Sequence, residues 1–134
     1  MLIVLDTNVF ISGMFWKGKE HDVLQLCIDE VHQNITSPVL VDELKRVLGY
    51  KKFDLKWNDI DDMLQIYISF SKIIHPDVVI NAVEGDPSDD RFIECAVSGD
   101  AKIIITGDKH LLDIQQYDNI EIIKPADFLK IVVE

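Results

Sequence analysis

Short apolar runs alternate with amphipathic stretches along the chain. The run Leu2–Leu5 is fully apolar, which is typical of a strand that is covered on both faces of a parallel sheet. By the same criteria of run length and helical spacing, strands are expected at residues 2–5, 34–36, 72–75, 102–106 and 120–123, and helices at residues 7–15, 20–31, 38–48, 59–70, 86–97, 108–114 and 125–132. This alternation predicts an α/β fold with a mostly parallel sheet of about four to five strands flanked by helices. The sequence contains neither a repeat nor a linker, so we expect one domain over residues 1–134.

Acidic residues stand where two of the predicted strands end. Asp6 follows Leu2–Leu5 directly, and Asp108 follows residues 102–106 after a glycine that allows the chain to turn sharply. In open α/β sheets, functional sites lie beyond the carboxyl ends of the strands. Aspartate is also a preferred N-cap, so each residue alone is equally consistent with capping the next helix.

Two further acids fall on helix faces that are expected to point inward. Glu43 lies beside the apolar arc of the helix 38–48, beyond the first turn where a dipole role would explain an acid; a salt bridge at the rim is the alternative. In the helix opened by Asp86 as N-cap and Pro87, Asp89 falls at the centre of the apolar arc and Asp90 at its edge. This geometry favours Asp89 over Asp90 as the acid that faces the strand ends.

The four acids selected in this way are Asp6, Glu43, Asp89 and Asp108. Carboxylates gathered in a partly desolvated cleft repel one another unless protons or cations compensate their charge. Oxygen ligands without histidine or cysteine suit Mg²⁺ or Mn²⁺, which also accept phosphate oxygens from a substrate. The sequence therefore predicts metal-assisted phosphate chemistry.

Four segments, taken in order, resemble the motifs of PIN-domain nucleases. They are residues 5–8 (LDTN), the helix 38–48 with its Glu43, residues 86–92 (DPSDDRF) and residues 106–112 (TGDKHLL). The resemblance covers essentially the whole chain and is strongest to the small prokaryotic VapC-like toxins of toxin–antitoxin operons. It implies a three-layer α/β/α fold, a metal-dependent ribonuclease activity on single-stranded RNA, an antitoxin protein as partner, and a homodimer.

The resemblance also assigns roles to individual residues. It implies that Asp6, Glu43, Asp89 and Asp108 are catalytic and hold one or two Mg²⁺ or Mn²⁺ ions, which would activate water for attack on phosphorus. Asn8 and Thr106 match the polar positions that flank the family acids, and would orient ligands or water. The family commonly has one aspartate followed by asparagine where this chain has Asp89 and Asp90, so Asp90 is the alternative third ligand.

Charge restricts how such a protein could meet RNA. Acids outnumber bases 24 to 13, giving a net charge of -11, which excludes a protein that coats nucleic acid with a basic surface and would suit a basic protein partner. The one basic stretch lies in residues 45–57, where Tyr50, Phe53 and Trp57 are interleaved with bases, as in surfaces that stack single-stranded bases. The same aromatics could instead anchor a helical hairpin in the core. The candidate RNA-binding residues are Lys45, Arg46, Lys51, Lys52 and Lys56.

Other features of the chain predict a cytoplasmic protein. The longest stretch without a charged side chain, residues 31–41, is too short and polar to span a membrane, and no basic leader precedes Asp6. Cys27 and Cys95 fall among apolar helical positions, which predicts reduced core thiols.

Three alternative functions were compared with the nuclease. A phosphoacceptor receiver module fits poorly, because Asp6 has no acidic neighbour and Asp54 does not end an apolar strand. A haloacid-dehalogenase-like phosphohydrolase would need an aspartate where Asn8 stands. A catalytically silent PIN fold that acts through a protein partner is disfavoured by the complete set of acids.

Overall fold

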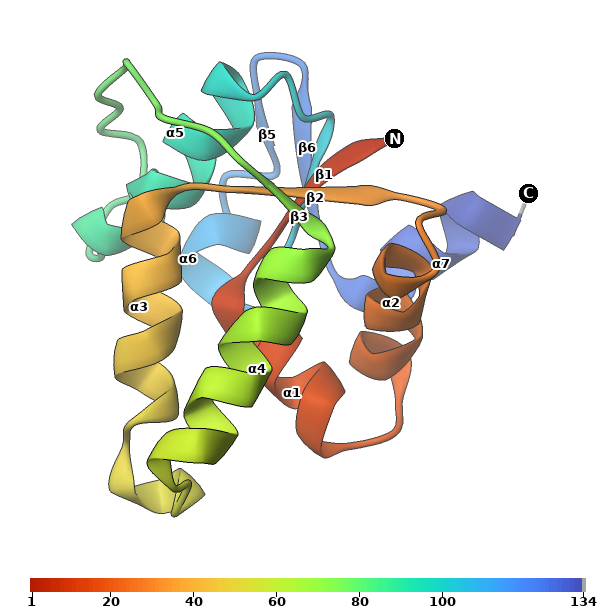
Figure 1. The fold of residues 1–134 in the computed structure, drawn as a ribbon. Helices are drawn as coiled ribbons and strands as arrows, with labels where there is room; N and C mark the ends of the chain where they lie inside the picture. The colour runs from red at the N-terminus through yellow and green to blue at the C-terminus, as the bar shows by residue number, and fades with distance from the viewer. Residues whose placement is uncertain (134) are drawn as a thin grey trace.

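The structure is a computed structural model and describes residues 1–133 (Figure 1). Its strands are β1 (Leu2–Leu5), β2 (Gln33–Thr36), β3 (Ser71–Ile73), β4 (Ile103–Ile105), β5 (Gln116–Tyr117) and β6 (Ile120–Ile123). Its α-helices are α1 (Thr7–Phe15), α2 (Lys19–Ile28), α3 (Pro38–Leu48), α4 (Trp57–Ser69), α5 (Asp90–Ser98), α6 (Lys109–Leu112) and α7 (Pro125–Val133). Two short 3-10 turns are η1 (Lys51–Phe53) and η2 (Pro87–Asp89).

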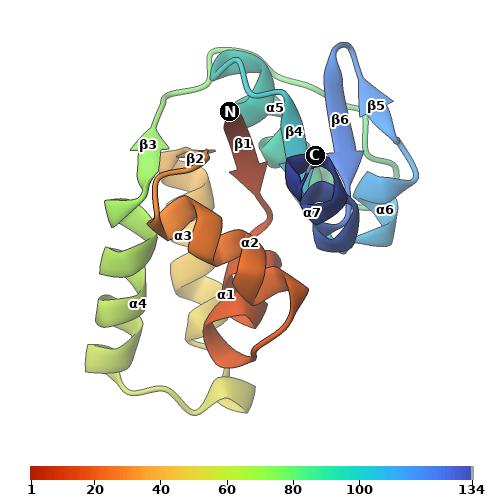
Figure 2. The ribbon, with the colours of Figure 1, turned by 90° about the vertical axis from the view of Figure 1, so that its right-hand side faces the viewer.

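The six strands form one sheet in the order β3-β2-β1-β4-β6-β5 (Figure 2). All neighbouring strands are parallel except β5, which pairs antiparallel with β6. The chain first moves from β1 outward to β2 and β3, and then crosses to β4 on the other side of β1. Because the direction of winding reverses between β1 and β4, a crevice is expected at the carboxyl ends of these two strands. Leu5 and Ile105 are opposite each other in that register, so the residues that follow them are neighbours.

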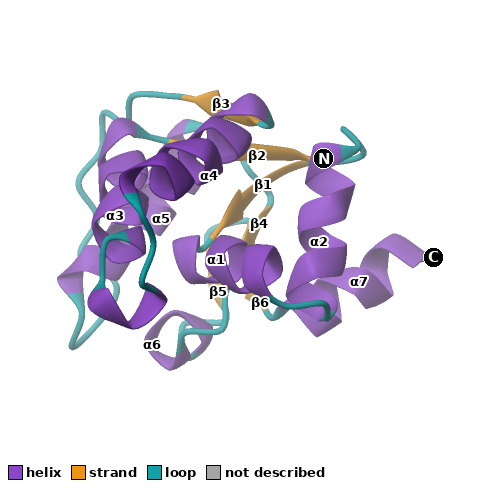
Figure 3. Cartoon of the chain, turned by 60° about the horizontal axis from the view of Figure 1, so that its bottom comes forward, coloured by secondary structure: helices purple, strands orange, loops and turns teal. Residues whose placement is uncertain are grey.

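Helices cover both faces of the sheet (Figure 3). In β1, Ile3 and Leu5 face a core built with α1, α2, α4 and α7, whereas Val4 faces a second core built with α5 and α6. Helix α3 contacts both α4 and α5 and contributes to both cores, with Leu44 in the first and Leu40 in the second. This confirms the predicted three-layer α/β/α architecture with a mostly parallel sheet, and it places α3 beside the crevice.

The structure differs from the elements expected from the sequence in several places, and the helix expected over residues 108–114, for example, spans only Lys109–Leu112. The sheet has six strands rather than four to five, because the two-residue strand β5 is too short to carry an alternating pattern. The helix expected over residues 20–31 ends at Ile28, because the chain turns through a left-handed residue, Glu30, with φ of 63°. The helix expected over residues 86–97 is divided into η2 and α5, a difference that determines where Asp89 and Asp90 point.

Two further expectations can be compared with the structure. Cys27 and Cys95 are free and buried, which agrees with the predicted core thiols, and burial raises the pKa of each thiol to about 12. Within residues 1–133, every helix is too short or too polar to cross a bilayer.

Candidate active site

The adjacent ends of β1 and β4 hold Asp6 in a fixed position. The Thr106 hydroxyl donates to Asp6 Oδ2 at 2.6 Å, and the backbone N–H of Asn8 donates to Asp6 Oδ1 at 3.0 Å. Asp6 is 3% exposed, and this burial, together with the nearby Asp108 carboxylate, raises the pKa of Asp6 against the opposing effect of the two hydrogen bonds. Asp6 therefore caps α1 and also lies in the crevice, so the two interpretations of this residue are compatible.

Thr106 links the two strand-end acids. Besides its bond to Asp6, its hydroxyl oxygen accepts from the backbone N–H of Asp108 at 2.9 Å. Asp108 in turn caps α6, because its Oδ1 accepts from the backbone N–H of His110 at 2.7 Å. Thr106 is fully buried. Its hydroxyl fixes the carboxylate of Asp6, and the bond to His110 fixes that of Asp108, both at the carboxyl ends of β1 and β4.

Asp86, Asp89 and Asp108 form a group of carboxylates between the start of α5 and the carboxyl end of β4. One oxygen of each lies within 4.8 Å of the others. Asp89 is 6% exposed, and its Oδ2 has no hydrogen-bond partner among the described residues. Burial raises the pKa of Asp89 to about 8, and the neighbouring Asp108, Asp86 and Asp6 carboxylates add to the effect. Among the described residues, none of these three carboxyl groups is paired with a lysine or arginine.

Asp90 points elsewhere, although it is adjacent to Asp89. Its Oδ1 accepts from the backbone N–H groups of Ala82 and Val83, both at 2.9 Å, and its side chain is buried. These bonds hold the segment that precedes η2 against the start of α5. The structure therefore brings Asp89, and not Asp90, into the group of acids.

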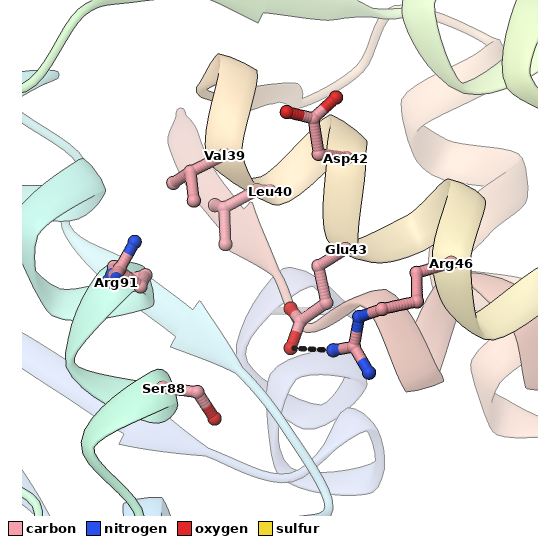
Figure 4. A pocket seen from close by; sticks show the side chains of 7 residues that line it. All are labelled: Val39, Leu40, Asp42, Glu43, Arg46, Ser88 and Arg91. Atoms are coloured by element: carbon pink, nitrogen blue, oxygen red, sulfur yellow. Dashed lines mark ion pairs between the residues drawn. The ribbon is translucent and has the colours of Figure 1, made fainter.

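Glu43 reaches the same region from α3. Its Oε1 lies 3.9 Å from an Arg46 guanidinium nitrogen, whereas its Oε2 is buried and has no partner among the described residues (Figure 4). Burial raises the pKa of Glu43, as do the charges of Asp6 and Asp86, and Arg46 and Arg91 oppose this rise. The expected rim salt bridge is thus present, but it leaves one carboxylate oxygen free.

Two cavities, each of about 290 Å³, adjoin these acids. Glu43 and Ser88 line one of them, between α3 and the start of α5. Asp6 and Asp108 line the other, together with Asn8, whose side chain is exposed, and Glu20 from the first turn of α2. Glu43 and the two strand-end acids therefore border different cavities.

Asp86 and Glu20 are acids at the site that the sequence analysis did not select. Asp86 was accounted for by its role as a cap, which it does perform, since its Oδ1 accepts from the backbone N–H of Ser88 at 3.2 Å. Glu20 stands in a first helical turn, where an acid needs no other explanation than the helix dipole. In both cases the local role, a helix cap or an acid in a first helical turn, explained the residue, so its position at the site could not be predicted from the sequence.

The chemistry of these donors fits a hard divalent cation. The group of Asp86, Asp89 and Asp108 offers oxygen ligands only. Two buried carboxylate oxygens, Asp89 Oδ2 within that group and Glu43 Oε2 outside it, lack partners among the described residues. A buried anionic oxygen without a partner is costly, and a cation would satisfy it. Asp6, Glu43, Asp86, Asp89 and Asp108 are the residues that could hold one.

The predicted RNA-binding bases lie along the far end of α3 and the turn that follows it. Lys45, Arg46, Lys51, Lys52 and Lys56 are all exposed. Of the three interleaved aromatics, Phe53 packs on Phe15 with ring centroids 5.4 Å apart, so it serves the core. Trp57 is 68% exposed, and the Lys45 amine lies 5.2 Å from its ring centroid. Trp57 therefore remains available as a stacking surface, beside a cavity of about 540 Å³.

Comparisons with known proteins agree with this architecture. The family model of the PIN domain matches residues 2–110. No curated protein sequence matches the chain significantly. Among solved structures, a chain of the crystal structure of VapBC2 from Rickettsia felis, bound to a DNA fragment from its promoter, is 16% identical, with a TM-score of 0.61. The match covers 91% of this chain and 97% of that one. The chain belongs to the PIN-domain family of nucleases.

Proposed function

We propose that this protein is a Mg²⁺- or Mn²⁺-dependent endoribonuclease that cleaves single-stranded RNA and acts as the toxin of a toxin–antitoxin pair. The observation that carries the proposal is the pair of buried carboxylate oxygens without partners, Glu43 Oε2 and Asp89 Oδ2, among the other acids of the crevice. Family membership supports nuclease chemistry, and the oxygen-only donor set supports a hard cation.

In this proposal, Asp6, Glu43, Asp89 and Asp108 are the catalytic acids and hold one or two divalent ions. Such an ion supplies charge neutralisation and an activated water at the phosphodiester. Asp86 is within reach of the same ion as Asp89 and Asp108.

Two polar residues orient these ligands rather than bind the ion themselves. Thr106 fixes the rotamer of Asp6 through its hydroxyl, so that one carboxylate oxygen is held in a single direction. Asn8 lies beside Asp6 and Asp108 with an exposed side chain, where it would orient water or substrate. Asp90 has no part in the reaction and serves to hold the chain before η2.

The RNA would bind at a restricted basic surface, because the net charge of -11 disfavours a general electrostatic attraction between the protein and a polyanion. The exposed bases Lys45, Arg46, Lys51, Lys52 and Lys56 form the one basic stretch of the sequence, which begins beside Glu43 at Arg46 and continues to the far end of α3, and exposed Trp57 offers a face for an unpaired base. This arrangement favours a single strand over a duplex, whose bases are already stacked.

A protein partner belongs to the same proposal. The similar structure from Rickettsia felis is that of a VapBC2 assembly on promoter DNA, and this supports an antitoxin that binds the present chain. We also propose a cytoplasmic location and a homodimer for the chain.

A cleavage assay tests the proposal. Labelled single-stranded RNAs of mixed sequence are incubated with the wild type and with Asp6→Asn, each in Mg²⁺, Mn²⁺ or EDTA. The matched control is Asp100→Asn. Asp100 is exposed and lies before β4, at the amino ends of the strands and so away from the acids; its backbone is left-handed, a conformation that asparagine tolerates. We expect metal-dependent cutting by the wild type and the control, and at least about a hundredfold slower cutting by Asp6→Asn. A folded wild type that cuts no RNA with either ion would overturn the proposal.

A further inference from the structure

The chain has only two arginines, and both line the cavity beside Glu43 (Figure 4). Arg46 comes from α3 and Arg91 from α5, so the two side chains are brought together by the tertiary fold and not by sequence proximity. The residues that line this cavity include no lysine, although the chain has eleven. Arginine is therefore concentrated at one place, next to a candidate catalytic acid.

Neither guanidinium is saturated by partners. Arg46 lies 3.9 Å from Glu43 and donates to the Tyr50 hydroxyl at 2.7 Å, and its side chain is 62% exposed. Arg91 is exposed and has no hydrogen bond or ion pair with any residue that the structure describes. A guanidinium carries five N–H donors, so most donors of both side chains have no partner among the described residues. Glu43 pairs with Arg46 and partly neutralises its charge, whereas the charge of Arg91 has no paired acid among the described residues.

The chemistry of the cavity fits a phosphate group. The planar fork of arginine pairs bidentately with phosphate oxygens, which a lysine amine cannot do. Both arginines line a cavity of about 290 Å³, Arg46 on the α3 wall and Arg91 on the α5 wall, and the remaining polar groups of its lining are Glu43, Asp42 and Ser88 (Figure 4). Glu43 would be engaged by a divalent ion in the active protein, and this would leave the arginines free for a different anion.

The position of the cavity indicates which phosphate would be bound. Arg46 and Asp42 also line the larger cavity that Trp57 borders, so the two spaces adjoin across α3. A single strand whose scissile phosphate lies at the acids would thus enter the cavity that Arg46 and Arg91 line, and would pass Arg46 before it reaches Trp57. Resting on the proposed function, we propose that Arg46 and Arg91 together bind an RNA phosphate next to the scissile one and thereby position the strand. They are positioning residues and take no part in the bond that breaks.

Salt dependence of RNA binding tests this inference directly. The probe is a fluorescein-labelled, mixed-sequence 12-nucleotide single-stranded RNA in Ca²⁺, followed by fluorescence anisotropy over a series of KCl concentrations. Each phosphate neutralised by the protein contributes about -0.7 to the slope of log K against log salt for single strands. We expect Arg91→Gln to weaken binding about three- to tenfold and to make the slope shallower by about 0.7, and Arg46→Gln to act similarly. Arg91→Lys should keep the slope while losing part of the affinity, because it keeps the charge and loses the fork.

Lys102→Gln is the matched control, because Lys102 is exposed and precedes β4, at the amino ends of the strands, whereas the acids follow the carboxyl ends. It changes the net charge by the same amount and should leave the slope unchanged. Thermal melting establishes that each variant is folded. In steady-state cleavage we expect Arg91→Gln to raise KM more than it lowers kcat, whereas Arg46→Gln also removes the ion pair with Glu43 and is therefore compared with the wild type by affinity and salt slope.

The two proposals fail in different ways. If the wild type cuts RNA but Arg91→Gln and Arg46→Gln match it in affinity, slope and KM, the positioning role is contradicted and the nuclease stands. If the variants bind RNA more weakly than Lys102→Gln by the expected amount but the wild type cuts nothing, the nuclease proposal fails while the anion subsite stands as an RNA contact.

Discussion

Asp89 and Asp90 are adjacent in sequence, but the same substitution should change the stability of the metal-free protein in opposite directions. Asp89 is buried among like charges with an oxygen that has no partner in the described chain, so loss of its charge relieves repulsion. Asp90 accepts from two backbone N–H groups, so loss of its charge weakens favourable contacts. Comparison of Asp89→Asn with Asp90→Asn therefore distinguishes an acid of the candidate metal site from a neighbouring acid that stabilises the fold.

For Asp90→Asn, the magnitude follows from the two hydrogen bonds. Bonds to a charged acceptor contribute about 1.5–3 kcal/mol each and bonds to a neutral one about 0.5–1.5 kcal/mol. The amide oxygen can keep both bonds in weakened form, so we expect the free energy of unfolding to fall by about 2 kcal/mol. For a chain of this size, that corresponds to a Tm lower by about 6–8 °C.

For Asp89→Asn, the magnitude depends on pH. The pKa of Asp89 is raised from 3.8 to about 8 on folding, so stability is lost as the pH rises from about 4 through 8. At about 1.4 kcal/mol for each tenfold change in proton affinity, the burden at pH 8 is on the order of 5 kcal/mol, and at pH 5 it is on the order of 1–2 kcal/mol. The buried amide offsets part of the gain, so we expect Asp89→Asn to stabilise by about 2 kcal/mol at pH 8 and by little at pH 5.

The assay is thermal and urea unfolding of the wild type and both variants in EDTA at pH 5 and pH 8. The wild type itself should be more stable at pH 5, because the pKa values of Asp6 and Glu43 are raised as well. Equal destabilisation by both variants at pH 8, or a stabilisation by Asp89→Asn that is the same at both pH values, would refute the reasoning.

Three other predictions concern residues around the crevice. Thr106→Val removes the hydroxyl that bonds Asp6 and Asp108; we expect unfolding experiments to show a loss of about 1–2 kcal/mol, and RNA cleavage to slow more than tenfold, whereas an unchanged cleavage rate would contradict the positioning of Asp6. Trp57→Ala should weaken single-stranded RNA binding by about 1–3 kcal/mol in anisotropy measurements while Tm stays within about 2 °C, because the ring is 68% exposed; equal affinity would remove Trp57 from the binding surface. Addition of Mg²⁺ to the metal-free protein should raise Tm by several degrees at pH 8, and this gain should be absent in Asp89→Asn.

Much of the fold could be predicted from the sequence, because its signals are local. The apolar run Leu2–Leu5 and the proline that starts α3 each specify an element without reference to the rest of the chain. The errors occurred where tertiary contacts decide. Residues 87–89 carry a helical pattern but form a 3-10 turn, because the carboxylate of Asp90 is bonded to the segment before it.

The candidate site was predictable to the extent that strand ends converge in a parallel sheet. Asp6 and Asp108 follow from that rule, whereas Asp89 was selected on the wheel of a continuous helix over residues 86–97 that the structure divides into η2 and α5. The sequence could not indicate that Asp86 joins Asp89 and Asp108, or that Arg91 lines the same cavity as Arg46, since both depend on how the start of α5 packs in the fold.

The central claim is that these acids together hold a divalent cation. Titration calorimetry of Mn²⁺ into the metal-free protein at pH 7, in two buffers of different ionisation enthalpy, tests it most directly. The account predicts binding of one or two ions with release of protons, because the pKa of Asp89 is about 8 before an ion binds, and it predicts loss of binding in Asp89→Asn but not in Asp100→Asn. A wild type that binds no Mn²⁺, or an Asp89→Asn variant that binds it as tightly as the wild type, would contradict the account.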